Sequence, residues 1–191
     1  MTLSKVMDTT EGQHKPLGKY IFNNVQFGKH DPLIEKLRAA NYNVFNHPTD
    51  DTGVLVTFPV KWDGVKFHKF NGKEVNLDTA IEQLEKYKML QTSWSQQNSS
   101  VTISYSLDEV EDIIDWLLTN WDSYVGVSFL YRADPNKTAK DLGYLYLPQE
   151  VVTEEAYIEY TARLLPVDLE NTSSFDEIVG DECSTGACPI R

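Results

Sequence analysis

Strand-like and helix-like segments alternate along most of the chain, and this alternation limits the folds that it can adopt. Residues 19–27 are rich in aromatic and β-branched side chains, which is typical of a strand. Asp31 and Pro32 follow as a helix start, because Asp caps the first turn and Pro fits within it. A nearly continuous apolar run at 54–60 predicts a strand that is covered on both faces. Strands that alternate with helices favour an α/β fold, in which the two kinds of element form layers.

The rest of the chain up to residue 164 extends this pattern. Asn71-Gly72 predicts the tight turn of a hairpin, since both residues tolerate positive φ angles. Ser106 and Glu109 have the spacing of a capping box, which predicts the start of a helix. Further strands are expected at 43–46, 65–70, 73–75, 99–105 and 125–131. Further helices are expected at 77–93, 106–118 and 153–162.

Composition narrows the class of protein. The 191 residues suit one domain, and a hydrophobic content of 41% argues against disorder. A net charge of −12 argues against binding to DNA or RNA, whose phosphates attract basic patches. No apolar run approaches the length of a membrane span and no signal peptide is evident, so we expect a soluble, cytoplasmic protein without membrane contact. The sequence contains no Gly-rich phosphate loop and no clear Ser–His–Asp arrangement.

The two cysteines, Cys183 and Cys188, follow an acidic segment that starts at about residue 165. Gly186 and Pro189 disfavour regular structure there, so the backbone can bend and bring the thiols within disulfide range. In a reducing compartment such a pair is more typical of redox chemistry than of a structural link. A dithiol on a flexible terminus can carry two electrons between sites by thiol–disulfide exchange. The alternative is an incidental exposed pair or disulfide.

A metal site is not predicted. Structural zinc usually takes four Cys or His ligands in paired spacings, and the two cysteines have no histidine near them in the sequence. All four histidines lie far upstream: His14, His30, His47 and His68.

Residues 182–189, Glu-Cys-Ser-Thr-Gly-Ala-Cys-Pro, resemble the C-terminal tail of ribonucleotide reductases. Other segments resemble the adenosylcobalamin-dependent (class II), monomeric-type branch of that family, in the same order along the chain. They are residues 2–4, 9–21, 31–40, 97–104, 132–135, 138–143 and 147–150. The resemblance therefore covers essentially the whole chain.

The resemblance implies an α/β fold that forms the C-terminal segment of the ten-stranded α/β barrel of ribonucleotide reductases, followed by a flexible tail. Residues 1–164 would then be part of the barrel domain, incomplete alone, and residues 165–191 would be the tail. The chain lacks the radical-carrying cysteine and the active-site cysteine pair of the family. Cys183 and Cys188 cannot replace them, because they match the tail pair.

The resemblance also implies a function. Ribonucleotide reductases convert ribonucleotides to deoxyribonucleotides for DNA synthesis, and their tail cysteines pass electrons from thioredoxin or a similar reductant to an active-site disulfide. Cys183 and Cys188 are accordingly expected to be a catalytic redox shuttle. This branch of the family implies adenosylcobalamin as the cofactor, bound mainly by the missing part, and a ribonucleoside triphosphate as the substrate. The isolated chain is expected to be inactive.

The first residues match the end of the family's substrate-phosphate loop, so Thr2 and Ser4 are expected to offer a hydroxyl or backbone N–H to a substrate phosphate. Met1 stands where the family has glycine, which suggests a split enzyme whose N-terminal part is encoded separately. Two alternatives stay open. The chain could be a stand-alone thiol–disulfide adaptor, or a non-catalytic remnant of a reductase.

Overall fold

The structure is a computed structural model, and it describes residues 12–132, 134, 137 and 139–169. The chain divides into two compact units, which are considered one at a time. Unit 1 contains the residues up to 21, together with 60–147 and 151–154. Unit 2 contains residues 22–59 and 148–150 and those from 155 onward.

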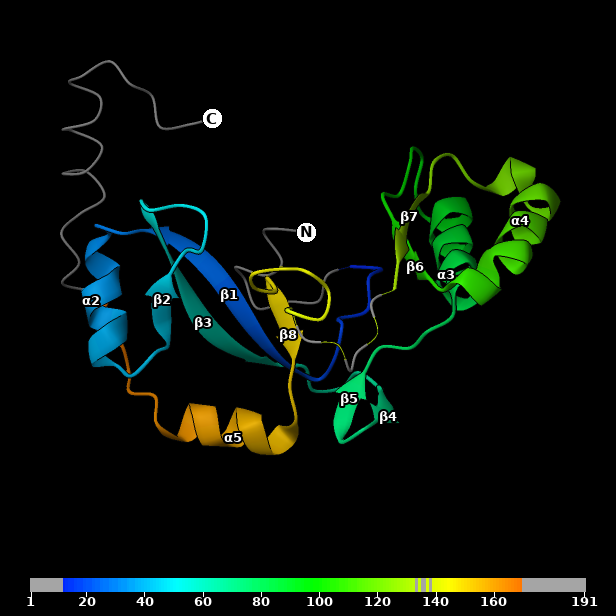
Figure 1. The fold of residues 1–191 in the computed structure, drawn as a ribbon. Coiled ribbons are helices and arrows are strands. Elements are labelled where there is room, and N and C mark those ends of the chain that lie inside the picture. Colours follow the sequence, from blue (N-terminus) through cyan, green and yellow to red (C-terminus); the bar gives the residue numbers. More distant parts are fainter. Residues whose placement is uncertain (1–11, 133, 135–136, 138, 170–191) are drawn as a thin grey trace, which may run out of the picture. The chain divides into compact units, whose positions relative to one another are not determined.

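The elements follow one another as a mixture of strands and helices (Figure 1). In chain order they are β1 (Tyr20–Gly28), α2 (Pro32–Ala39), β2 (Val44–Asn46), β3 (Gly53–Lys61), β4 (His68–Phe70), β5 (Lys73–Val75), α3 (Ala80–Ser93), β6 (Thr102–Tyr105), η1 (Leu107–Glu109), α4 (Val110–Thr119), η2 (Trp121–Ser123), β7 (Ser128–Tyr131), β8 (Gln149–Val151) and α5 (Glu154–Ala162).

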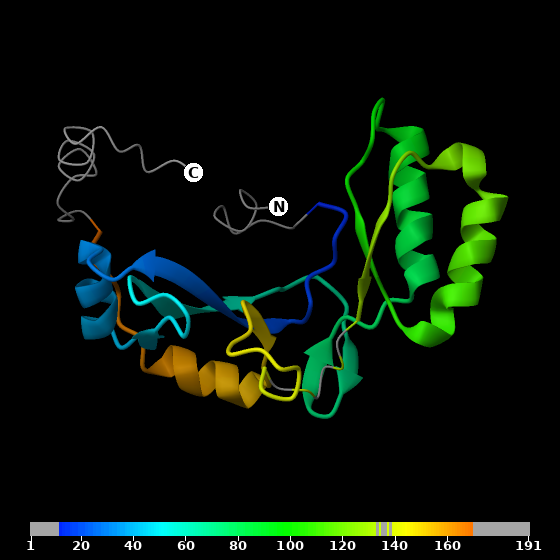
Figure 2. The same ribbon diagram turned by 45° about the horizontal axis from the view of Figure 1, so that its top comes forward.

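Most of unit 2 is a four-stranded sheet with strand order β2-β3-β1-β8. β2 and β3 pair in antiparallel fashion. Val54 and Val56 of β3 are buried against Ile34 and Leu37 of α2, which forms one hydrophobic core. Figure 2 shows α5 running alongside the same sheet. The central strand β3 is thus covered, as its continuous apolar run predicts.

Tyr160 attaches α5 to the sheet of unit 2. Its side chain is buried, and its hydroxyl donates a hydrogen bond to the carbonyl oxygen of Thr57 at 2.8 Å. The same hydroxyl accepts the backbone N–H of Asn43 at 2.9 Å. The ring centroid lies 4.9 Å from that of Phe22 on β1. One phenol therefore satisfies two backbone groups and fills part of the core.

The residues after α5 stay in contact with unit 2 as far as they are described. The N–H of Leu165 donates to the carbonyl oxygen of Ala40 at 3.0 Å, and Val167 packs against the core between α2 and β3. The chain thus runs along α2 before it reaches residue 170, where the described residues end.

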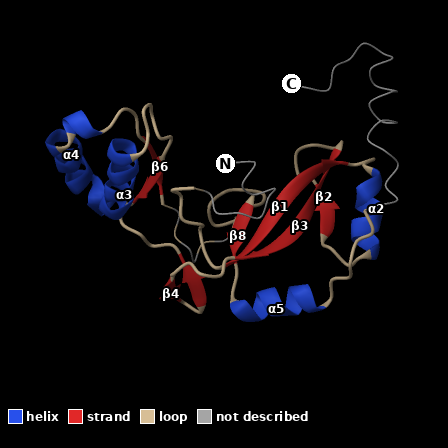
Figure 3. Ribbon diagram, turned by 180° about the vertical axis from the view of Figure 1, so that it is seen from behind, coloured by secondary structure: helices blue, strands red, loops and turns tan. Residues whose placement is uncertain are grey.

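Unit 1 is built around a parallel pair of strands. β6 and β7 are parallel, with α4 in the connection between them, and α3 precedes β6. The strands, α3 and α4 follow one another as layers (Figures 1 and 3). The buried core residues of this part are Ala80, Leu84, Tyr87, Val101, Ile103, Ile113 and Trp116. The short hairpin of β4 and β5 also belongs to unit 1.

The two outer edges of the β6–β7 pair differ. Ser128 and Arg132 donate their N–H groups to the carbonyls of Val101 and Tyr105, at the two ends of β6. Successive residues of a strand point their backbone groups in opposite directions, so the N–H and C=O groups of Phe129 and Tyr131 point away from β6. Among the described residues, the N–H and C=O groups of Phe129 and Tyr131 have no hydrogen-bond partner on that side. This side of β7 is an open strand edge.

Side chains occupy the outer edge of β6. The N–H of Thr102 donates to His14 Nε2 at 3.2 Å. The N–H of Ser104 donates to Gln83 Oε1 at 3.0 Å, and Gln83 Nε2 donates to the Ser104 carbonyl at 2.9 Å. Nearer the start of the strand, Gln13 Nε2 donates to the carbonyl of Ser100 at 2.6 Å. Amides and an imidazole therefore take the place of a neighbouring strand.

Most predicted elements are confirmed. Asp31 Oδ1 accepts the N–H of Leu33 at 2.8 Å and so caps α2, and the turn residues Asn71 and Gly72 have φ angles of 47° and 77°. β8 was not predicted, because its three residues, Gln149, Glu150 and Val151, carry no strand-like pattern. Within the described part of the chain, every helix is too short or too polar to cross a membrane.

Tyr160→Phe should destabilise the protein, because it leaves the buried carbonyl of Thr57 and the part-buried N–H of Asn43 without their partner while the ring keeps its place. We expect a loss of about 1–3 kcal/mol in the free energy of unfolding, measured by urea titration of the intact chain. Tyr144→Phe is the control, since the side chain of Tyr144 is 62% exposed and should tolerate the change. Equal stability of the two variants would contradict this role of the phenol.

Candidate functional site

The site residues predicted from the sequence lie outside the described part of the chain. Cys183, Cys188, Thr2 and Ser4 all fall in residues 1–11 or 170–191. Their roles therefore stay predictions. The polar groups that the structure brings together lie in unit 1, in two places: a cluster at the carboxyl ends of β6 and β7, and a pocket near the start of β6.

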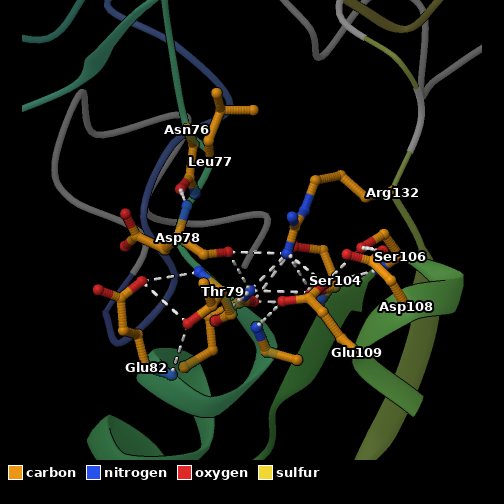
Figure 4. Close-up of polar contacts among 12 residues, drawn as sticks. Asn76, Leu77, Asp78, Thr79, Glu82, Ser104, Ser106, Asp108, Glu109 and Arg132 are labelled. Carbon is orange, nitrogen blue, oxygen red and sulfur yellow. Dashed lines mark hydrogen bonds and ion pairs between the residues drawn. The ribbon is translucent and has the colours of Figure 1, made fainter.

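The polar cluster starts from two helix N-termini (Figure 4). At the start of α3, the N–H of Thr79 donates to Glu82 Oε2 at 2.7 Å and the N–H of Glu82 donates to Thr79 Oγ1 at 3.2 Å. At the start of η1, which leads into α4, the N–H of Ser106 donates to Glu109 Oε2 at 2.7 Å. The capping box predicted from Ser106 and Glu109 is thus confirmed.

Glu109 extends beyond its own helix. Its Oε1 atom accepts the N–H of Ala80, the first residue of α3, at 2.7 Å. One carboxylate therefore caps the N-terminal ends of two helices, where partial positive charge favours an anion. Its Oε2 atom also lies 3.2 Å from Nη2 of Arg132, which directly follows β7.

Arg132 completes the cluster from the strand side. Its Nη2 atom donates to the carbonyl oxygens of Asp78 at 2.8 Å and Ser104 at 3.0 Å. Only 19% of the Arg132 side chain and 13% of the Glu109 side chain are exposed, so water screens this ion pair weakly. The Nε atom of Arg132 is buried and has no hydrogen-bond partner among the residues that the structure describes. The guanidinium thus ties the ends of β6 and β7 to the loop before α3.

The pKa of Glu109 indicates what this cluster can do. Burial alone would raise the pKa of Glu109, but the N–H groups of Ala80 and Ser106, the Ser106 hydroxyl and the Arg132 charge outweigh it, so the pKa is lowered. A carboxylate with a lowered pKa stays ionised near neutral pH and is a poor general acid. The arrangement is therefore suited to holding elements in position, not to proton transfer.

A pocket of about 670 Å³ lies near the start of β6 and the end of α3. Its lining residues combine apolar and polar side chains: Gly12, Gln13, His14, Lys86, Met89, Leu90, Trp94, Ser99, Ser100 and Thr102. The Oε1 atom of Gln13, one of these residues, is buried and lacks a hydrogen-bond partner within the described part of the chain. The volume falls within the range of about 300–1,000 Å³ that small-molecule sites occupy.

Sequence reasoning missed the residues that organise this unit. The sequence singled out neither Arg132 nor Gln83, because the contacts of each depend on segments remote in the sequence. The contact between Glu109 and Ser106 could be predicted, because a capping box is a local sequence pattern. Among the described residues, no group of three or more His, Cys, Asp or Glu side chains could hold a metal ion.

No protein-family model matches the chain. Two curated relatives are each 28% identical to it over 199 residues: an adenosylcobalamin-dependent ribonucleoside-triphosphate reductase of Levilactobacillus brevis and a probable enzyme of the same kind from Dictyostelium discoideum. These matches cover 100% and 99% of this chain. A crystal structure of a B-12 dependent (class II) ribonucleotide reductase matches 96% of this chain with a TM-score of 0.72 and 22% identity. The predicted resemblance to class II ribonucleotide reductases is confirmed.

The chain spans only about a quarter of the reductases that it matches. It covers 25% of the Levilactobacillus brevis enzyme, 24% of the Dictyostelium discoideum enzyme and 23% of the chain in the crystal structure. The mixed α/β fold is shared with the class II structure, as predicted. The placement of these elements in the C-terminal part of a reductase barrel stays a prediction.

Arg132→Met should strongly destabilise unit 1, because the change leaves the Glu109 carboxylate partly buried without its cation and frees two backbone carbonyls. We expect a loss of about 3 kcal/mol in the free energy of unfolding, measured by urea titration. Lys61→Met is the matched control. It removes a cation from an exposed pair with Asp63, whose side chain is 72% exposed, and should change stability little. A similar small effect for both variants would show that the Arg132 pair is not structural.

The pKa of Glu109 also makes stability depend on pH. Because this pKa is lower in the folded chain, Glu109 stabilises the fold above the ordinary glutamate pKa of about 4.3, and this contribution is lost as the pH falls through the folded pKa. Glu109→Gln should therefore lose less stability than the unchanged chain on acidification from about pH 5 to pH 3. Urea titrations at a series of pH values measure this difference. Parallel pH profiles would contradict the lowered pKa.

Proposed function

We propose that this chain forms the C-terminal part of an adenosylcobalamin-dependent ribonucleotide reductase, whether as a segment of a longer chain or as a subunit of a split enzyme. In this role it contributes late strands of the barrel and a terminal dithiol. The observation that carries the proposal is the similarity over the entire chain to two ribonucleoside-triphosphate reductases. The tail pair Cys183 and Cys188 also supports the proposal, because a dithiol can carry two electrons by thiol–disulfide exchange.

The geometry of unit 1 supports the barrel assignment. β6, α4 and β7 form a strand–helix–strand unit with parallel strands, which is the repeating unit of α/β barrels. Parallel sheets are normally larger than two strands and are covered on both faces. The open edge of β7 at Phe129 and Tyr131 fits a sheet that continues with strands from elsewhere in the enzyme.

The dithiol supplies the electrons. Replacing the 2′-hydroxyl of a ribonucleotide by hydrogen consumes two electrons and releases water, and a dithiol in the active site becomes a disulfide. A thiolate of the tail pair attacks that disulfide, forms a mixed disulfide and releases one thiolate. The second tail cysteine then attacks the mixed disulfide and releases the other. Cys183 and Cys188 end as a disulfide, which thioredoxin or a similar dithiol reduces outside the barrel.

A tail solves a problem of access. Thioredoxin is a folded protein, so it cannot enter a barrel that shields a radical, whereas two cysteines on a linker can. Tethering raises the effective concentration of the dithiol to about the millimolar range for short flexible linkers. The first tail residues, 165–169, run along α2 in unit 2, so the exchange must be carried by the part beyond them.

Adenosylcobalamin is the cofactor named for the relatives, and we propose it for the enzyme to which this chain contributes. When bound, this cofactor supplies radical chemistry. Among the described residues, the pocket near β6 does not fit it, because a volume of about 670 Å³ suits a drug-sized molecule and this cofactor is much larger. We therefore assign cofactor binding mainly to sequence outside this chain.

The substrate of the enzyme is proposed to be a ribonucleoside triphosphate, the substrate class in the names of the relatives. Thr2 and Ser4 are proposed to contact its phosphates through hydroxyl or backbone N–H groups, as in the phosphate loop that their sequence resembles. Thr2→Ala and Ser4→Ala should then raise the KM for the nucleotide more than they change kcat. An unchanged KM would remove both residues from the phosphate site.

Replacing either tail cysteine distinguishes reduction by thioredoxin, through the tail, from direct reduction by dithiothreitol. In the assembled reductase, Cys183→Ser or Cys188→Ser should abolish repeated turnover with thioredoxin, because the remaining thiol cannot release its partner from a mixed disulfide. A single turnover should survive, and so should turnover with dithiothreitol, which reaches the inner disulfide directly. Deoxynucleotide formation with each reductant measures this difference. Ser184→Ala is the control in the same segment.

Two outcomes would overturn the proposal. Equal loss of activity with both reductants would mean that the cysteines do not act as a shuttle. Thiol–disulfide exchange by the chain with thioredoxin, combined with no deoxynucleotide formation in any assembly with reductase sequence, would favour the adaptor.

A further inference from the structure

The outward face of α4 carries a row of exposed apolar side chains. Leu107, Ile114, Leu118 and Trp121 are 72%, 50%, 67% and 69% exposed. Ile114 and Leu118 are four residues apart in α4 and lie on one side of it, whereas Leu107 and Trp121 belong to the short helices η1 and η2 at its two ends. The opposite side is buried through Ile113 and Trp116, so these four side chains are not needed for the core of unit 1.

Acidic residues line one flank of this row. From 106 to 125 the chain has six carboxylates and no Lys or Arg. They are Asp108, Glu109, Glu111, Asp112, Asp115 and Asp122. At 100° per residue, Glu111 and Asp115 fall beside Ile114 and Leu118 on one flank of α4, and Asp122 follows in η2 next to Trp121. We call this combination of Leu107, Glu111, Ile114, Asp115, Leu118, Trp121 and Asp122 the α4 face.

The carboxylates of the α4 face differ from the others in the segment. Glu109 is engaged with Arg132, and Asp108 accepts the Ser106 hydroxyl at 2.5 Å. In the part of the chain that the structure describes, Glu111, Asp115 and Asp122 have neither a hydrogen bond nor an ion pair through their side chains. In the layering of unit 1, α3 lies between α4 and the strands (Figure 3), and the apolar side chains of the α4 face are exposed. Its charges and its apolar groups are free to meet a partner.

The chemistry of the face selects the class of partner. Carboxylates repel the phosphates of nucleic acids and of anionic membranes. A second copy of this chain would place two acidic faces against each other, in molecules whose net charge is −12 each. An amphipathic helix that carries Lys or Arg beside its apolar stripe satisfies both halves of the face, because its stripe covers the apolar row and its cations meet the carboxylates.

We propose that the α4 face is the docking site for a basic amphipathic helix of a partner polypeptide. The apolar row supplies most of the affinity, and Leu118 and Trp121 are its large side chains toward the end of α4. The carboxylates set the orientation of the partner and speed its association. This role is independent of the proposed reductase function, because it uses neither tail cysteine.

Binding of a designed peptide tests the proposal with the intact chain. The probe is a synthetic helix of about 18 residues with a leucine stripe flanked by lysines, and the control probe has the same composition in scrambled order. Trp94→Phe removes the other strongly exposed tryptophan, so that Trp121 is the main solvent-exposed emitter. The ordered peptide should shift the Trp121 emission to the blue as its indole is buried, and calorimetry should give the dissociation constant.

Two variants test the two halves of the face. Ile114→Ser with Leu118→Ser should weaken binding at least about tenfold, whereas Leu145→Ser, at another exposed leucine, should not. Replacement of Glu111, Asp115 and Asp122 by their amides should also weaken binding and flatten its dependence on salt. The charge-matched control replaces three exposed acids of other regions, Asp51, Glu155 and Glu159, by their amides.

Three results would overturn the proposal. The scrambled peptide could bind as tightly as the ordered one, or the α4 variants could bind as well as their controls. The chain could also associate with itself and bury Trp121 without any peptide, in which case the face is an interface between copies. Far-UV circular dichroism of each variant confirms that the exposed substitutions leave α4 folded.

Discussion

The ion pair between Glu109 and Arg132 holds together four segments of unit 1. Glu109 starts one helix and caps another, while Arg132 reaches the carbonyls at the end of β6 and before α3. Each contact ends at a backbone group, so the pair fixes the course of the chain and not merely the position of two side chains. Because both groups are mostly buried, the loss of either partner would leave a charge that water screens poorly. The parallel strands depend on this clamp, since only two strands share the backbone hydrogen bonds.

The clamp lies at the carboxyl ends of β6 and β7, the end at which α/β folds usually place their chemistry. Here that position is filled by a carboxylate and a guanidinium that bind each other and nearby backbone groups, an arrangement suited to support and not to proton transfer. This agrees with the proposed division of labour in a class II reductase. The described residues would support and complete a barrel, while the reacting groups would come from other sequence and from the two tail cysteines. A chain that spans about a quarter of its relatives need not contain a whole active site.

Local patterns predicted the elements well. The Asp31 cap, the Asn71-Gly72 turn and the Glu109 capping box involve residues within a few positions of one another, so the sequence alone carries the signal. The cluster could not be predicted in the same way. Arg132 meets Asp78 and Gln83 meets Ser104 only after α3, α4 and the strands have packed. β8 escaped notice because three residues without apolar alternation contain too little pattern. The family resemblance, in contrast, was readable from short segments spread over the chain.

The two outer edges of the β6–β7 pair differ in whether their backbone groups are already hydrogen-bonded. On the β6 side, the backbone N–H and C=O groups are bonded to the side chains of His14, Gln83 and Gln13. Another strand could pair with this edge only after these three side chains had been displaced. On the β7 side, Phe129 and Tyr131 present free backbone groups. Any sheet that grows from this unit therefore grows in one direction, and an isolated copy exposes one adhesive margin instead of two. Within the β6–β7 pair, aggregation through a strand edge should therefore start on the β7 side.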